Sequence, residues 1–240
     1  MITCPICSNN TQIIGKIDLN RSCLDKDKKR IIVKSNINVE YVECTKCGFI
    51  HSPEMCAWSK NKFIKLIYNK EYYKVDPDGK KSRPELNAIY LYNKFKNIPI
   101  SHLDYGGGNG YVSKILRNKG LNSKSYDPFY DKKFPITSFD LITAFEVFEH
   151  HPNPNELAND LNKLSGTKSV IIFTTAVSDE IANPIGWGYV APRNGHVCIY
   201  TKISLGILLN KINFKLFEIT KDVAYVAYND KPKWFNSIFN

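Results

Sequence analysis

The sequence has no apolar run of about 18 residues, the length that a membrane-spanning helix needs. Its best apolar candidate, residues 169–177, has only the length of a strand. Residues 1–5 do not begin a basic segment followed by an apolar one, which is the pattern of a secretory signal. Internal repeats and low-complexity segments are also missing. We therefore expect a globular protein in the cytoplasm that spans no membrane.

Acidic residues are in the minority, with 23 Asp and Glu against 33 Lys and Arg, so the net charge is +10. A basic excess can attract nucleic acids, anionic membranes or phosphorylated small molecules. The lysines are scattered along the chain and form no clear cluster, which argues against a nucleic-acid-binding surface. The basic excess therefore indicates a general bias in composition more than a dedicated binding patch.

Four of the seven cysteines form two Cys-x-x-Cys pairs. In a chain without an export signal, such pairs favour metal binding over disulfide bonds. Each pair folds a tight turn, and four thiolates close a tetrahedral zinc site that has no open position. The pattern predicts a structural Zn²⁺ site at Cys4, Cys7, Cys44 and Cys47. The alternatives are unmetallated turns, redox chemistry at one pair, or substitute ligands from Cys23, His51 and Cys56.

The sequence pattern changes along the chain. Residues 1–58 contain short β-like runs and all four paired cysteines, which indicates a small zinc-ribbon-like β module. Residues 59–83 form a connector, and residues 84–240 form a larger domain. In that domain, apolar strands such as 139–147 alternate with helices, which predicts an α/β fold with a parallel sheet covered on both faces.

Residues 103–110, Leu-Asp-Tyr-Gly-Gly-Gly-Asn-Gly, lie between an expected strand and an expected helix. Glycines allow a sharp turn and the close approach of a ligand, and the helix start offers free N–H groups. Asp127 follows the next short strand, where a carboxylate can accept both hydroxyls of a ribose. Asp104 lies inside the turn, where it would repel a pyrophosphate but suit a cofactor with a cationic amino-acid end.

The pattern Asp-x-Gly-x-Gly-x-Gly at residues 104–110 resembles the first motif of class I S-adenosylmethionine-dependent methyltransferases. Residues 139–150 are similar to the fourth-strand motif of that family, and the resemblance covers about residues 85–230. It implies a Rossmann-like domain with a seven-stranded, mostly parallel sheet whose last strand is antiparallel. Only 11 residues separate Asp127 from Phe139, so the third strand is expected to be shortened or missing.

The same resemblance implies S-adenosylmethionine as the cofactor and S-adenosylhomocysteine as its product. On this basis the cofactor lies against residues of the glycine turn and of the two strand ends that follow it. These residues are Asp104, Gly106, Gly108, Gly110, Asp127, Phe145 and Glu146.

Methyl transfer from a sulfonium is an in-line displacement, in which the enzyme aims the nucleophile and often removes its proton. The candidate catalytic bases are His196, in the loop after the expected fifth strand, and His150, after the fourth; each is otherwise structural. Arg193 is a candidate for holding a phosphate or carboxylate of the substrate. Trp187 and Tyr189 are candidates for an apolar wall of the substrate site, or they simply pack.

Zinc knuckles ahead of a methyltransferase domain resemble sugar C-methyltransferases of deoxysugar pathways and related enzymes of surface-polysaccharide gene clusters. The resemblance implies methyl transfer to an oxygen or carbon of a sugar or phosphorylated precursor. One alternative is an RNA methyltransferase that uses a basic zinc module, although the histidine ligand of the zinc-containing ribosomal-RNA guanine methyltransferases is poorly matched. The other is a non-catalytic protein whose zinc module binds a partner. The oligomeric state does not follow from the sequence.

Overall fold

The structure is a computed structural model that describes residues 2–25, 29–131 and 133–239. The chain forms two compact units. The first unit contains Met1–Pro77, Phe148–Asn155 and Ala176–Leu208, and the second contains Asp78–Val147, Glu156–Thr175 and Leu209–Asn240. Each unit combines three segments that are separated in the sequence. The division at residues 58 and 84 stays a prediction from the sequence.

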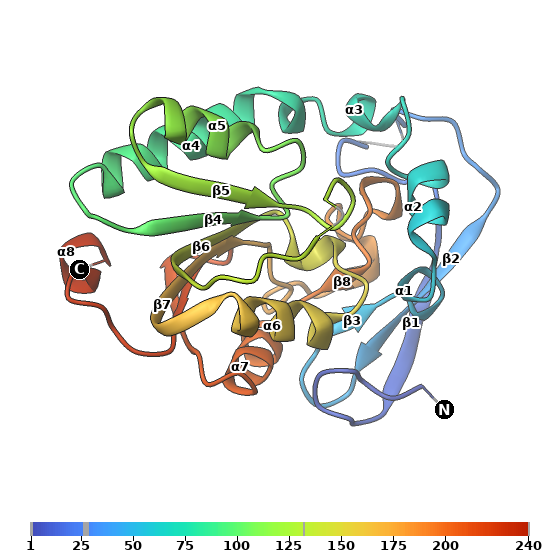
Figure 1. Ribbon diagram of the computed structural model, residues 1–240. Helices are drawn as coiled ribbons and strands as arrows, with labels where there is room; N and C mark the ends of the chain where they lie inside the picture. Colours follow the sequence, from blue (N-terminus) through green and yellow to red (C-terminus); the bar gives the residue numbers. More distant parts are fainter. Residues whose placement is uncertain (1, 26–28, 132, 240) are drawn as a thin grey trace. The chain divides into compact units, whose positions relative to one another are not determined.

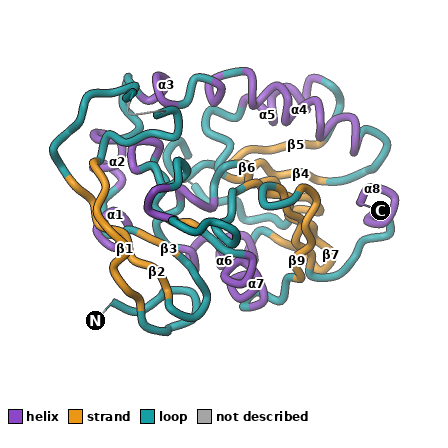
Figure 2. The backbone as a smooth tube through the Cα atoms, turned by 180° about the vertical axis from the view of Figure 1, so that it is seen from behind, coloured by secondary structure: helices purple, strands orange, loops and turns teal. Residues whose placement is uncertain are grey.

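The second unit is built on a six-stranded mixed sheet of order β5-β4-β6-β7-β10-β9, seen from opposite sides in Figures 1 and 2. β5, β4, β6 and β7 are parallel, whereas β10 is antiparallel to both β7 and β9. The α/β fold and the antiparallel last strand are therefore confirmed. The strands are β4 (Ser101–Tyr105), β5 (Asn122–Tyr126), β6 (Phe139–Phe145), β7 (Ser165–Thr174), β9 (Lys215–Thr220) and β10 (Ala224–Tyr228).

The prediction of seven strands is wrong, because the sheet formed by the described residues has six. The described residues between Tyr126 and Phe139 contain no strand, and β5 has only β4 as a neighbour. This segment begins with a turn in which the amide groups of Tyr130 and Asp131 donate to the carbonyl oxygen of Asp127. A crossover to another parallel strand needs a dozen or more residues, so the segment is too short for both the crossover and the strand.

Helices pack on the sheet of the second unit. Figure 1 shows α4 (Ser82–Phe95) and α5 (Tyr111–Asn118) together along β4 and β5, and α6 (Pro154–Lys163) near β7. Leu91, Phe95 and Leu116 are fully buried in one apolar cluster with strand residues. Helix α8 (Phe235–Phe239) adds Phe235 to the same cluster.

The first unit has its own sheet, of order β1-β2-β3-β8 with antiparallel pairing throughout. Three strands come from the N-terminal segment, but β8 lies almost 150 residues further along the chain. The N-terminal β module therefore takes its fourth strand from outside residues 1–58. The strands are β1 (Thr11–Asp18), β2 (Asn38–Cys44), β3 (Ile50–His51) and β8 (Cys198–Ile199).

The remaining helices are short. They are α1 (Pro53–Cys56), α2 (Lys60–Leu66), α3 (Tyr72–Val75), α7 (Lys202–Asn210) and the 3₁₀ turns η1 (Asp78–Lys80), η2 (Phe148–His150), η3 (Pro184–Gly186) and η4 (Pro192–Asn194). Within the described residues, no helix combines the length and the apolar character needed to cross a bilayer.

Candidate functional site

The glycine turn at the end of β4 adopts a backbone that few other residues tolerate. Gly106, Gly108 and Gly110 have φ angles of 71°, 57° and 75°, in the left-handed region. A Cβ atom on Gly106 would lie 2.5 Å from Cγ2 of Val147, whereas one on Gly108 would meet no atom within 4 Å. Gly106 is thus required by packing, while Gly108 borders open space that a ligand can fill. Gly110 is the N-cap residue of α5.

Asp127 is bound directly to this turn. Its Oδ2 accepts a hydrogen bond from the Gly108 amide at 2.9 Å, and its Oδ1 accepts one from the Phe129 amide at 2.7 Å. Each carboxylate oxygen has a second lone pair, so these bonds leave acceptor capacity for ligand hydroxyls. The structure therefore brings Asp127 and the glycine turn together at the carboxyl ends of β4 and β5.

Asp104 lies under the turn with only 3% of its surface exposed. Burial, and then the negative charge of Asp127, raise the pKa of the Asp104 carboxyl to about 7. The Thr143 hydroxyl on β6 donates to its Oδ1 at 2.7 Å and opposes that rise. Asp104 is therefore divided between its neutral and charged forms near neutral pH.

A buried polar network that no sequence motif predicts continues from Asp104. His102 Nε2 lies 3.0 Å from the Thr143 hydroxyl, and His102 Nδ1 lies 2.8 Å from the Ser123 hydroxyl. Burial lowers the pKa of His102 to about 3, so the imidazole is neutral. The only sequence signal was a polar residue facing inward on each of three short strands, and such residues also occur singly in ordinary cores.

Phe145 and Glu146 follow at the end of β6. Glu146 has a φ of 54°, an unusual value for a residue with a side chain. Its amide donates to Oγ1 of Thr174 at 3.0 Å, and the Thr174 hydroxyl donates back to Glu146 Oε1 at 2.8 Å. This reciprocal pair holds the strained residue at the end of β7. Parallel strand ends meet at one edge of a sheet, which is where α/β proteins bind ligands.

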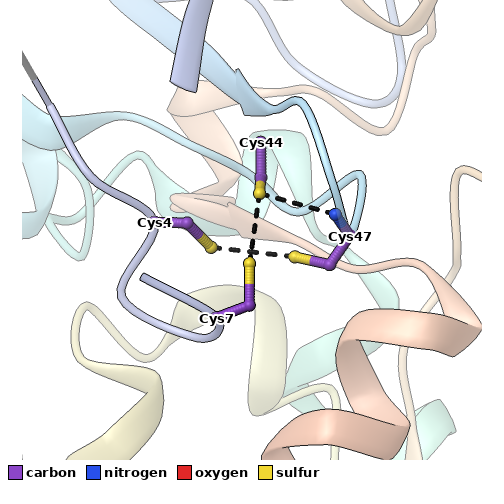
Figure 3. A group of neighbouring side chains, drawn as sticks. All are labelled: Cys4, Cys7, Cys44 and Cys47. Carbon is purple, nitrogen blue, oxygen red and sulfur yellow. Dashed lines mark hydrogen bonds between the residues drawn. The ribbon is translucent and has the colours of Figure 1, made fainter. Parts of the chain in front are cut away.

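The four paired cysteines converge in the first unit, with their side chains pointing toward one another (Figure 3). The Cys4 and Cys47 sulfurs are 3.7 Å apart and the Cys7 and Cys44 sulfurs 3.3 Å apart, and all four lie within 4.8 Å of one another. A tetrahedral ion with Zn–S bonds of about 2.3 Å spaces its sulfurs about 3.8 Å apart. The backbone amides of Lys46 and Cys47 point at Cys44 Sγ, at 3.5 Å each, and such bonds stabilise a thiolate. The cluster therefore fits a zinc ion.

The two candidate bases also lie in the first unit and are neighbours. The rings of His150 and His196 have centroids 4.9 Å apart. His196 Nδ1 lies 2.7 Å from the carbonyl oxygen of Tyr189. A carbonyl only accepts, so Nδ1 carries the proton and Nε2 has the lone pair. His196 is 4% exposed, and this tautomer suits a base.

Of the three candidate substrate residues, Tyr189 lies next to His196, with ring centroids 4.3 Å apart. The rings of Trp187 and Tyr189 have centroids 5.0 Å apart. Arg193 is 2% exposed and donates to the Ile67 carbonyl oxygen at 2.7 Å and to Asn69 Oδ1 at 3.0 Å. These bonds anchor the segment before His196. The roles of Arg193, Trp187 and Tyr189 in substrate binding stay predictions.

The sequence predicts no role for Glu149, yet this residue lies in the same group as His150 and His196. It is fully buried, and the Tyr189 hydroxyl donates to its Oε1 at 2.7 Å. One ligand atom each from Glu149, His150 and His196 lie within 4.8 Å of one another. The adjacent Glu-His pair in the sequence was the available signal, but only the fold brings His196 to it.

Replacing Gly106 by Ala should lower the free energy of unfolding by about 2–4 kcal/mol, because it adds both backbone strain and a clash with Val147. Gly108→Ala is the matched control. It adds the strain alone and should cost about 1–2 kcal/mol. Urea unfolding followed by circular dichroism measures both values, and equal losses would contradict the assigned difference in packing.

Residues 80–219 match the family model described as "Methyltransferase domain". Comparison with curated protein sequences gives no significant match. Among solved structures, the 1,6-didemethyltoxoflavin-N1-methyltransferase of Burkholderia thailandensis, with bound 1,6-didemethyltoxoflavin and S-adenosylhomocysteine, has 13% identity and a TM-score of 0.50, covering 82% of this chain and 96% of its own.

Two further solved structures are similar over a smaller share of this chain and of their own length. An O-methyltransferase family protein from Burkholderia thailandensis has 9% identity and a TM-score of 0.49, covering 66% of this chain and 58% of its own. Human N-acetylserotonin methyltransferase, in complex with S-adenosylmethionine, has 12% identity and a TM-score of 0.46, covering 70% of this chain and 62% of its own. The chain thus spans about three fifths of the length of these two proteins. Because the family model matches more than half of the chain, this protein belongs to the methyltransferase domain family.

Proposed function

We propose that this protein transfers the methyl group of S-adenosylmethionine to a small-molecule acceptor. The observation that carries the proposal is the edge of the sheet in the second unit. There, the open space at Gly108, the buried Asp104 and the Gly108-bound Asp127 lie together. Membership in the methyltransferase domain family supports the same function.

The cofactor, when bound, supplies a methyl group on a positively charged sulfur. Asp104 would favour its cationic amino-acid end, because a carboxylate stabilises a nearby ammonium group. Asp127 would accept the ribose hydroxyls with the lone pairs that its two backbone bonds leave. Gly106, Gly108 and Gly110 shape the turn, and Phe145 and Glu146 flank it at the end of β6.

The acceptor is proposed to be a sugar or a phosphorylated precursor of surface-polysaccharide biosynthesis, methylated on oxygen or carbon. The support is the resemblance of the two cysteine pairs and the following domain to sugar C-methyltransferases. His196 is the first candidate for removing the acceptor proton, since its tautomer leaves Nε2 as an acceptor. His150 is the second. Arg193, Trp187 and Tyr189 are the candidates for acceptor binding.

The cysteine cluster is proposed to hold a structural Zn²⁺. Four thiolates would close the coordination sphere, so the ion would stabilise the fold and take no part in the reaction. Burial raises the pKa of the Cys4 thiol to about 11 in the metal-free protein, and a coordinated thiol is deprotonated outright. Zinc binding should therefore release protons.

Calorimetric titration with S-adenosylmethionine, beside NADH as a control, tests the proposed cofactor. We expect one-to-one binding of S-adenosylmethionine and no binding of NADH. Preference for NADH, or binding of neither compound, would overturn the assignment of the glycine turn. RNA binding that weakens steeply with salt would instead favour the RNA methyltransferase.

The affinity for S-adenosylmethionine should rise with pH through about 7, because ionised Asp104 attracts the cationic end of the cofactor. With a pKa of about 7, Asp104 is mostly neutral at pH 6 and half charged at pH 7, so Kd should fall about fivefold between these values, a range in which the α-ammonium group of the cofactor keeps its charge. Calorimetry at each pH measures the change. Asp104→Asn should bind more weakly with a flat profile; a wild-type slope in this variant would assign the effect to another group.

His196→Ala should lower kcat by about 10²–10⁴ and leave the Kd for S-adenosylmethionine unchanged, if His196 removes the acceptor proton. His150→Ala is the comparison, since its ring lies next to His196. Single-turnover rates with an accepted substrate measure both effects. Unchanged turnover in His196→Ala would remove this residue as the base and favour His150.

Cys47→Ser should remove the bound zinc and loosen the sheet of the first unit. Cys47 closes the turn between β2 and β3, and β3 pairs with β8, two residues after His196. We therefore expect faster amide hydrogen exchange at residues 196–199, with little change in residues 101–105 of β4. Metal analysis by mass spectrometry supplies the zinc content, and full zinc in the variant would contradict the four-cysteine site.

A further inference from the structure

A second group of metal-ligating side chains lies in the first unit, apart from the cysteines. Glu149 and His150 lie on η2, and His196 follows η4. One ligand atom of each lies within 4.8 Å of the other two. Two imidazoles and one carboxylate form a set that binds divalent transition metals in many proteins.

The surrounding bonds hold two of these side chains in the form that a metal requires. His196 Nδ1 donates to the Tyr189 carbonyl oxygen at 2.7 Å, which leaves the Nε2 lone pair as the ligand. The Tyr189 hydroxyl donates to Glu149 Oε1 at 2.7 Å. Tyr189 therefore orients both groups, one through its backbone and one through its side chain, as the outer contacts of metal ligands commonly do.

The burial of Glu149 and His196 favours the binding of a cation between them. Glu149 is fully buried and His196 is 4% exposed. A carboxylate removed from water carries a large desolvation cost, which a directly bound divalent cation offsets. The anionic ligand together with two neutral imidazoles would leave a site of net positive charge around the ion.

We propose that Glu149, His150 and His196 bind a divalent first-row transition-metal ion. Metal–ligand bonds of about 2.0–2.2 Å place such ligand atoms about 3.0–3.5 Å apart. Movement of the half-buried His150 side chain would bring its ligand atom closer to the other two, while Tyr189 holds Glu149 and His196. Three protein ligands leave a coordination position for an oxygen from outside the protein, unlike the four thiolates of the cysteine cluster.

A bound ion would change which group removes the proton of the acceptor in the proposed methyl transfer. A metal on Nε2 occupies the lone pair with which His196 would act as a base, so the two roles exclude each other in one molecule. An acceptor hydroxyl bound to the ion would have a lowered pKa and would lose its proton more easily. Metal binding itself does not rest on the proposed function, because it can be measured without cofactor or acceptor.

Cobalt is the probe that separates the two metal sites. Co²⁺ is titrated into the protein loaded with one Zn²⁺ per chain and followed by visible absorption, with metal content from equilibrium dialysis. We expect one Co²⁺ per chain beside one Zn²⁺, with d–d bands of nitrogen and oxygen ligation and no thiolate charge-transfer band. Cobalt that binds only with a thiolate band, or not at all, would overturn the proposal.

Variants then assign the ligands. His196→Ala and Glu149→Gln should each weaken Co²⁺ binding by about 100-fold or more. His151→Ala is the matched control, because His151 is adjacent to His150 but its Nδ1 accepts the Asn153 amide, and it should bind Co²⁺ as the wild type does. Cobalt affinity retained in Glu149→Gln, which keeps the shape of the side chain, would overturn the site even if His196→Ala failed to fold.

Titration with S-adenosylmethionine in the same samples keeps this inference separate from the proposed function. Cofactor binding without cobalt binding would overturn the metal site and leave the methyltransferase proposal standing. Cobalt binding without cofactor binding would support the metal site and overturn the methyltransferase proposal.

Discussion

Parallel pairing of β4 with β5 on one side and β6 on the other is the constraint on which the cofactor site depends. It makes three consecutive strands end at the same edge of the sheet. The glycine turn, Asp127 and the Phe145–Glu146 pair follow those three ends. The hydrogen bond from Gly108 to Asp127 then fixes two of these ends to each other. A shift in the register of either pairing would separate them.

In the first unit, pairing between antiparallel strands positions the polar groups. Its antiparallel sheet places β3, which follows the cysteine turn, against β8, which follows His196. The Tyr41 hydroxyl on β2 adds a 2.7 Å bond to the carbonyl oxygen of His196. The segment that carries His196 is thus supported by the sheet that the cysteine cluster closes. This gives the proposed zinc site a physical connection to a residue proposed for catalysis or metal binding.

The parts of the structure that the sequence predicted are those marked by short motifs. The glycine turn, its Asp127 partner and the two cysteine pairs all have short motifs with fixed spacing, and the structure brings each set together. The alternation of strands and helices likewise gave the α/β class. The functional roles of these residues stay predictions.

The parts that the sequence did not predict depend on contacts between distant segments. β3 and β8 have two residues each, which is too short for any hydrophobic period. The His102 network joins residues of three strands, and Tyr189 joins Glu149 to His196 through one backbone and one side-chain bond. The missing third strand was anticipated from the short segment after Asp127, yet the family pattern still led to a count of seven.

The pairing of Ile50 with Ile199 also has a consequence for how the chain folds. The two residues are about 150 positions apart, and closing so long a loop slows folding relative to local contacts. During synthesis, β1, β2 and β3 emerge early and must wait for most of the chain before β8 completes their sheet. In that interval β3 presents an open edge that other strands can pair with. An early-forming cysteine cluster would hold this edge in place until its partner arrives.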